Sequence, residues 1–129
     1  MSESLESTIR TAYAAFGRGD VDGYLSACSE DFTFSIPGRG AIAGTFRGAS
    51  GLNELAGKAM QGTDGTFREE VEDVLANERH AVVLARHEFT RSGRRHEYRT
   101  AHVYEVRNGK LTQCWEQPRD LHAFEKAWA

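Results

Sequence analysis

The stretch RHEYRTAHVYEVRNGKLTQCWEQ, residues 95–117, decides the fold. Apolar and polar residues alternate along both of its halves, 95–106 and 110–117, and Asn108-Gly109 joins them. An Asn-Gly pair between alternating runs is a strong hairpin signal, because both turn positions take a positive φ. The stretch therefore predicts two antiparallel strands connected by a two-residue turn.

A two-residue turn fixes the register and so decides which side chains share a face. The predicted pairs on one face are Val106 with Leu111, Tyr104 with Gln113, His102 with Trp115, and Thr100 with Gln117. On the other face, Val103 lies beside Cys114, Ala101 beside Glu116, and Glu105 beside Thr112. The first face is aromatic with a few polar groups, which is typical of a ligand pocket. The alternative is a solid core in which the polar groups find hydrogen-bond partners.

Ser92-Gly93 predicts a second hairpin that adds the strand 80–91 to this sheet. Its pairs on the pocket face are Phe89 with His96, His87 with Tyr98, Ala85 with Thr100, and Val83 with His102. The opposite face then holds Arg86, Glu88, Glu97 and Arg99, with like charges directly opposed. Diagonal Arg86–Glu97 and Glu88–Arg99 contacts can offset that repulsion. A longer loop with an odd change in length would instead exchange the two faces of strand 80–91.

The N-terminal part reads as helical. Apolar residues at helical spacing predict a helix over 3–17, capped by Ser2 or Ser4, and a short second helix capped by Asp20. Tyr13 lies on the buried stripe of the first helix, so its hydroxyl needs a partner. The rest of the chain predicts a strand over 31–36, a loop with one extended piece up to Gly48, a helix over 51–61 capped by Ser50, an extended run over 66–76, and a short helix after Asp120.

Composition limits the classes of function. The chain has 129 residues, which suggests one domain, and a net charge of −3. No basic run exceeds Arg94-Arg95, which argues against nucleic acid as a partner. No apolar run approaches the roughly 20 residues of a membrane helix, and the N-terminus lacks a signal-peptide pattern, so we expect a cytoplasmic protein.

The cysteine and histidine patterns indicate no metal. Cys28 and Cys114 lack the C-x-x-C spacing of a zinc site and are expected to be buried thiols. His87 and His102 share the predicted pocket face, and His96 can join them, but the sequence contains no H-E-x-x-H run and places no carboxylate near them. We therefore predict no metal and no other cofactor.

The chain resembles the nuclear transport factor 2-like superfamily, and within it the SnoaL-like polyketide cyclase and ketosteroid isomerase-like branch. The order of the elements carries this resemblance, together with Asp31-Phe32, Gly44-Thr-Phe-Arg-Gly48, Asp73-Val-Leu-Ala76, and Asn108-Gly-Lys-Leu-Thr-Gln-Cys-Trp115 followed by Asp120. It implies an α+β, cystatin-like cone, in which a curved and mostly antiparallel sheet wraps around N-terminal helices. One domain would span residues 1–129, enclose a pocket and form a homodimer.

The resemblance also implies candidate catalytic residues. Asp120 matches the position of the cyclases' acid–base Asp, Tyr13 that of the isomerases' oxyanion tyrosine, and His102 is a candidate for the cyclases' histidine. The predicted reaction is proton abstraction α to a carbonyl on a small apolar substrate, in an isomerase, cyclase or hydrolase-like enzyme. Asp120 can instead be a helix cap, and the protein can instead be a non-catalytic binder or dimerisation module. The expected pocket lining is Phe16, Tyr24, Phe32, Phe34, Val83, His87, Tyr98, Thr100, Tyr104, Leu111, Gln113 and Trp115.

Overall fold

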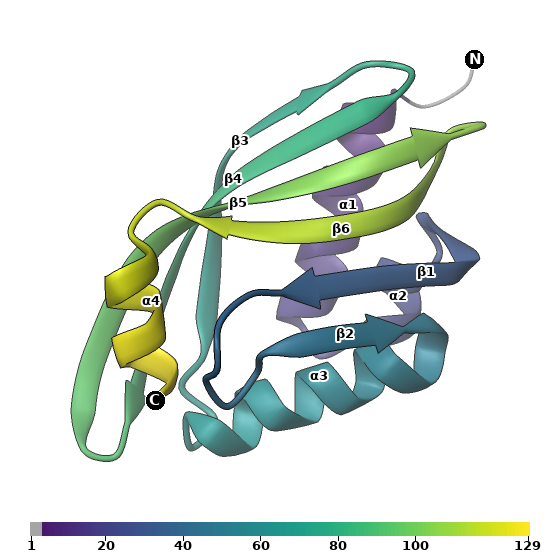
Figure 1. Ribbon diagram of the computed structural model, residues 1–129. Coiled ribbons are helices and arrows are strands. Elements are labelled where there is room, and N and C mark those ends of the chain that lie inside the picture. Colours follow the sequence, from purple (N-terminus) through teal and green to yellow (C-terminus); the bar gives the residue numbers. More distant parts are fainter. Residues whose placement is uncertain (1–3) are drawn as a thin grey trace.

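The computed structural model describes residues 4–129 (Figure 1). It confirms the predicted α+β class, with N-terminal helices and one curved six-stranded sheet. The helices are α1 (Leu5–Gly17), α2 (Val21–Leu25), α3 (Gly48–Gly62) and α4 (Leu121–Trp128). The strands are β1 (Cys28–Ile36), β2 (Gly44–Arg47), β3 (Arg68–Ala76), β4 (His80–Arg91), β5 (Arg94–Arg107) and β6 (Lys110–Pro118).

The sheet has the strand order β2-β1-β6-β5-β4-β3 and is antiparallel except where β1 pairs with β6. The long strands β3 to β6 curve, and α1 lies across their concave side, while α3 runs beside β2 and β1 (Figure 1). The interior between the helices and this concave side is where a pocket can form. None of the helices among residues 4–129 is long and apolar enough to cross a membrane.

Local sequence explains where the helices begin. Ser4 caps α1 by accepting from the Ser7 N–H, and Asp20 caps α2 by accepting from the Gly23 N–H. Ser2, the other predicted cap of α1, lies outside the described residues. The cap predicted for α3 is wrong: the helix begins at Gly48 with Arg47 as an N-cap that makes no side-chain hydrogen bond, so Ser50 lies inside its first turn.

The hairpin at Ser92-Gly93 has the predicted register. Both residues have a positive φ, and the pairs Phe89–His96, His87–Tyr98, Ala85–Thr100 and Val83–His102 all form. Like charges do face each other on the outer surface, and Arg86 contacts Glu97 diagonally at 3.4 Å, as predicted. Arg99, predicted to contact Glu88, pairs with Glu72 instead.

The hairpin at Asn108-Gly109 also forms, but its register changes after the first pair. Val106 faces Leu111 as predicted, whereas Glu105 faces Gln113, so Thr112 is an extra residue in β6. This β-bulge places His102 opposite Glu116 and Tyr104 opposite Cys114. The predicted His102–Trp115 pair is therefore wrong, because an extra residue turns every later side chain to the other face.

Candidate active site

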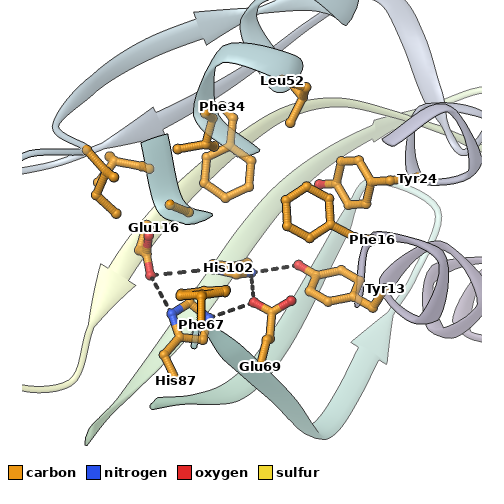
Figure 2. A pocket seen from close by; sticks show the side chains of 14 residues that line it. Tyr13, Phe16, Tyr24, Phe34, Leu52, Phe67, Glu69, His87, His102 and Glu116 are labelled. Carbon is orange, nitrogen blue, oxygen red and sulfur yellow. Dashed lines mark hydrogen bonds and ion pairs between the residues drawn. The ribbon is translucent and has the colours of Figure 1, made fainter. Parts of the chain in front are cut away.

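A small pocket lies between the helices and the inner face of the sheet (Figure 2). Its volume is about 50 Å³, counted as space open to the centres of water molecules. The wall is apolar except for two phenols and four charged or titratable groups. The lining residues are Tyr13, Phe16, Tyr24, Phe34, Ile36, Ile42, Leu52, Leu55, Ala59, Phe67, Glu69, His87, His102 and Glu116.

The predicted lining is partly recovered. Tyr13, Phe16, Tyr24, Phe34, His87 and His102 line the pocket. Phe32, Val83, Tyr98, Thr100, Tyr104 and Leu111 are buried behind this first layer of the wall. The prediction that Gln113 and Trp115 line the pocket is wrong, because the bulge at Thr112 turns both side chains to the outer face of the sheet. Glu116 lies where the Trp115 indole was predicted.

Two carboxylate–imidazole pairs form the polar end of the pocket. Glu69 on β3 is the cross-strand neighbour of His87 on β4, and His102 on β5 is that of Glu116 on β6. Glu69 Oε2 lies 2.6 Å from His87 Nε2 and 4.0 Å from His102 Nδ1. Glu116 Oε2 lies 3.5 Å from His102 Nε2 and 3.9 Å from His87 Nδ1. The four groups therefore form one cluster across four strands (Figure 2).

Burial and charge oppose one another in this cluster. Burial opposes ionisation of Glu69 and Glu116, but the adjacent imidazoles outweigh it and lower the pKa of both carboxyl groups. Burial likewise opposes protonation of His102, but Glu116 and Glu69 outweigh it and raise the pKa of this imidazole. The pocket thus holds two ionised carboxylates and an imidazole that favours its cationic form.

A chain of phenols begins at His102. Its Nδ1 lies 2.7 Å from the Tyr13 hydroxyl, which contacts the Tyr104 hydroxyl, and Tyr104 lies 2.7 Å from the Tyr24 hydroxyl. When His102 is protonated, its Nδ1–H donates to Tyr13 and each phenol donates to the next, which leaves the Tyr24 O–H free to donate into the pocket. Burial raises the pKa of all three phenols, so they stay neutral donors.

A second chain ties the C-terminal helix to the cluster. The Trp128 indole N–H donates to the Tyr98 hydroxyl at 2.7 Å, and that hydroxyl lies 3.1 Å from His87 Nδ1. With His87 neutral, Tyr98 donates to Nδ1 and His87 Nε2–H donates to Glu69. α4 therefore fixes the orientation of this imidazole.

Asp120, the predicted base, is not in the pocket. It is exposed and caps α4 by accepting from the Ala123 N–H at 3.1 Å. The structure thus agrees with the alternative reading of Asp120 as a helix cap, because an Asp at this position satisfies a free N–H of the first helical turn.

Sequence reasoning missed Glu69 and Glu116. Glu69 stands in the acidic run Glu69-Glu70-Val71-Glu72-Asp73, where no single carboxylate stands out. The alternation of Phe67, Glu69 and Val71 would have placed its side chain inward with two apolar neighbours. Glu116 faces the pocket only because of the bulge in β6, which the sequence pattern did not reveal.

The pocket adjoins an open surface cleft of about 720 Å³. Phe16, Ala59, Phe67 and Glu69 line both spaces, so they form the wall between them. The Glu69 side chain is 12% exposed, which makes this carboxylate the member of the cluster nearest to an entrance.

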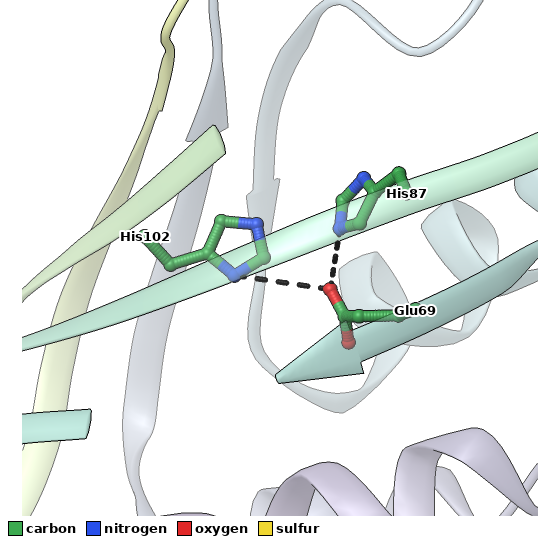
Figure 3. Close-up of side chains that lie close together, drawn as sticks. All are labelled: Glu69, His87 and His102. Atoms are coloured by element: carbon green, nitrogen blue, oxygen red, sulfur yellow. Dashed lines mark hydrogen bonds and ion pairs between the residues drawn. The ribbon is translucent and has the colours of Figure 1, made fainter. Parts of the chain in front are cut away.

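Three donor atoms of the cluster also lie close enough together to bind a metal ion. Glu69, His87 and His102 each offer one ligand atom, all within 4.8 Å of one another (Figure 3). The sequence argument against a metal depended on the lack of a carboxylate near the histidines, and Glu69 supplies one.

Comparisons with known proteins agree with this architecture. The family model described as SnoaL-like domain matches residues 9–114. The uncharacterized protein Rv0034 of Mycobacterium tuberculosis is 32% identical over 122 residues, which cover 94% of this chain and 93% of the relative.

Solved structures give the same result. Bal32a from a soil-derived mobile gene cassette has a TM-score of 0.88 at 28% identity and covers 97% of this chain and 96% of its own. TerC, co-crystallized with polyporic acid, has a TM-score of 0.82 at 25% identity. The match covers 96% of this chain and 98% of TerC. The fold is shared by an NTF2-like protein of unknown function from Burkholderia pseudomallei, with 21% identity and a TM-score of 0.84. That match covers 98% of this chain and 99% of the other.

Proposed function

Because the chain belongs to the SnoaL-like domain family, within the NTF2-like superfamily, we propose that it is an acid–base enzyme acting on a small carbonyl compound. One observation carries this proposal: an ionised carboxylate and both end members of a chain of neutral phenols, Tyr13 and Tyr24, line the same apolar pocket. Such a pair can remove a proton α to a carbonyl and stabilise the resulting enolate. TerC with polyporic acid supports the view that this fold holds small organic molecules.

In this proposal Glu69 takes the role first given to Asp120. Its carboxylate lines both the pocket and the cleft, so an entering substrate meets it. Glu69 accepts the α-proton and returns it to the same or a neighbouring carbon. His87 holds the carboxylate in place through the 2.6 Å contact.

Tyr24, at the end of the phenol chain, donates to the enolate oxygen. Protonated His102 keeps the chain oriented this way, because its Nδ1–H occupies the Tyr13 oxygen. The enolate is thereby stabilised by a neutral phenol in a pocket whose wall is mostly apolar.

Tyr24→Phe tests this role. We expect the rate of α-proton exchange to fall by about 10²-fold, which is the effect of removing one oxyanion donor. The measurement is solvent deuterium incorporation into a panel of small cyclic and aryl ketones, followed by NMR. Thermal unfolding of the variant serves as the control for folding. Exchange within about twofold of wild type would remove Tyr24 from the mechanism. Saturable binding of a ketone with no exchange in wild type would favour the non-catalytic binder.

We also propose a homodimer formed through the outer sheet face. An apolar row, broken only by a serine, crosses five strands there in register: Leu75, Val82, Val103, Trp115 and Ser35. Leu75 is 53% exposed in the single chain, and an apolar row of this kind fits a second copy of the same surface. The charges on this face are already paired within the chain, since Arg86 contacts Glu70, Glu88 and Glu97.

Val103→Glu tests the dimer. A charge at the centre of the row would be buried without a partner, so we expect the dimer dissociation constant to rise at least about 30-fold. Light scattering after size exclusion measures the mass. Gln61→Glu, which adds the same charge at an exposed position of α3, should leave the mass unchanged. A dimer that survives Val103→Glu would place the interface elsewhere.

A further inference from the structure

We infer that Glu69, His87 and His102 form a binding site for one divalent transition-metal ion of the zinc type. The three donor atoms come from adjacent strands β3, β4 and β5 and converge at the polar end of the pocket (Figure 3). This goes beyond the proposed function and rests on the geometry and charges of the cluster, whether or not the acid–base reaction occurs.

The spacing of the donors suits such an ion. Neighbouring ligands of a tetrahedral zinc ion with bonds of about 2.1 Å lie roughly 3.4 Å apart. Glu69 Oε2 lies 2.6 Å from His87 Nε2 and 4.0 Å from His102 Nδ1, which brackets that value. A shift of the Glu69 carboxylate by less than about 1 Å, away from His87, would even out the two distances. A bound ion would displace the Tyr13 hydroxyl from His102 Nδ1. Because all three residues line the pocket, a fourth ligand could come from there.

In each histidine, the ring nitrogen that would not bind the metal already lies near an oxygen atom. His87 Nδ1 lies 3.1 Å from the Tyr98 hydroxyl, and His102 Nε2 lies 3.5 Å from Glu116 Oε2. Metal-binding histidines usually donate their second N–H to a carboxylate or another oxygen in this way. Glu116 is 3% exposed, and among the described residues its Oε2 and His102 Nε2 lack a hydrogen-bond partner. These buried atoms face each other as a metal-bound imidazole and its supporting carboxylate would.

The charges of the cluster also favour one divalent cation. Two buried carboxylates, Glu69 and Glu116, need two positive charges nearby. A single divalent ion supplies both and leaves the two imidazoles neutral. Two imidazoles and one carboxylate are ligands that suit zinc or cobalt, whereas magnesium and calcium prefer oxygen ligands alone.

Binding can be measured on the full chain without a histidine tag. The probe is ZnCl₂ in competition with a chromophoric chelator, and CoCl₂ reports the coordination geometry through its visible absorption. We expect one zinc per chain. Glu69→Gln and His87→Gln should each weaken binding at least about 100-fold, and Glu116→Gln by about 10- to 100-fold. Glu70→Gln and His80→Gln, both exposed, are the matched controls and should bind as wild type does.

The outcomes separate this inference from the proposed function. No zinc binding by wild type, or equal binding by wild type, Glu69→Gln and His87→Gln, overturns the site. If one replaced ligand unfolds the chain, the other variant decides the question. Zinc bound at Glu69 also blocks proton abstraction, so deuterium exchange should be lost on adding zinc. Specific zinc binding without any exchange in the zinc-free chain would refute only the acid–base proposal.

Discussion

Glu69→Gln is expected to lower the rate of α-proton exchange by between about 10²- and 10⁴-fold, the range for removing a general base. The amide keeps the size of the carboxylate and can still accept from His87 Nε2, which lies 2.6 Å from the carboxylate in wild type. It cannot accept a proton from carbon, so the loss should appear in kcat rather than in KM. Deuterium incorporation into the ketone panel measures both parameters.

Glu70→Gln is the matched control. The neighbouring residue carries the same group on the same strand, but its side chain points outward and pairs with Arg86 at 2.9 Å. We expect this variant to exchange within about twofold of wild type, because exposed ion pairs contribute little. If Glu69→Gln and Glu70→Gln behave alike, the base is another group.

The fold was predictable because its turns are local. Ser92-Gly93 and Asn108-Gly109 each specify a two-residue turn through a positive φ, and both turns form. The register of β4 against β5 follows directly from the first of them, and with it the shared face of His87 and His102. Alternation and turn chemistry are properties of neighbouring residues, so a single sequence reveals them.

The site was less predictable because one residue of β6 decides it. Without an extra residue at Thr112, His102 would face Trp115; with it, His102 faces Glu116. The Thr112 hydroxyl donates to the Glu105 carbonyl at 3.3 Å, within the bulged segment. A bulge depends on how the whole sheet bends, and no pattern within residues 110–117 reports it.

Asp120 illustrates a different limit. A resemblance compares positions along the chain, and Asp120 stands at the position of the acid–base Asp of the SnoaL-like cyclases. The local physics of Asp120 supports only a cap, because the residue begins α4 and its carboxylate accepts from the Ala123 N–H. The pocket instead takes its carboxylates from the start of β3 and the end of β6.

His102→Leu should lower the free energy of unfolding by about 3–5 kcal/mol, since it leaves the buried Glu116 carboxylate without its imidazole partner. Glu116 is 3% exposed, so water cannot replace that partner. The variant also frees the Tyr13 hydroxyl, which retains its contact with Tyr104. Urea denaturation followed by circular dichroism measures the change.

The double variant His102→Leu/Glu116→Met then separates stability from function. Replacing a buried ion pair with apolar groups of similar size is often neutral or stabilising, so we expect it to recover at least about 2 kcal/mol of the loss. It should remain inactive in proton exchange, because the phenol chain has lost the imidazole that orients it. A double variant no more stable than His102→Leu would mean that Glu116 stabilises the fold without His102. A double variant at least as stable as wild type but inactive would show that this pair is kept in the pocket for chemistry, at a cost to the fold.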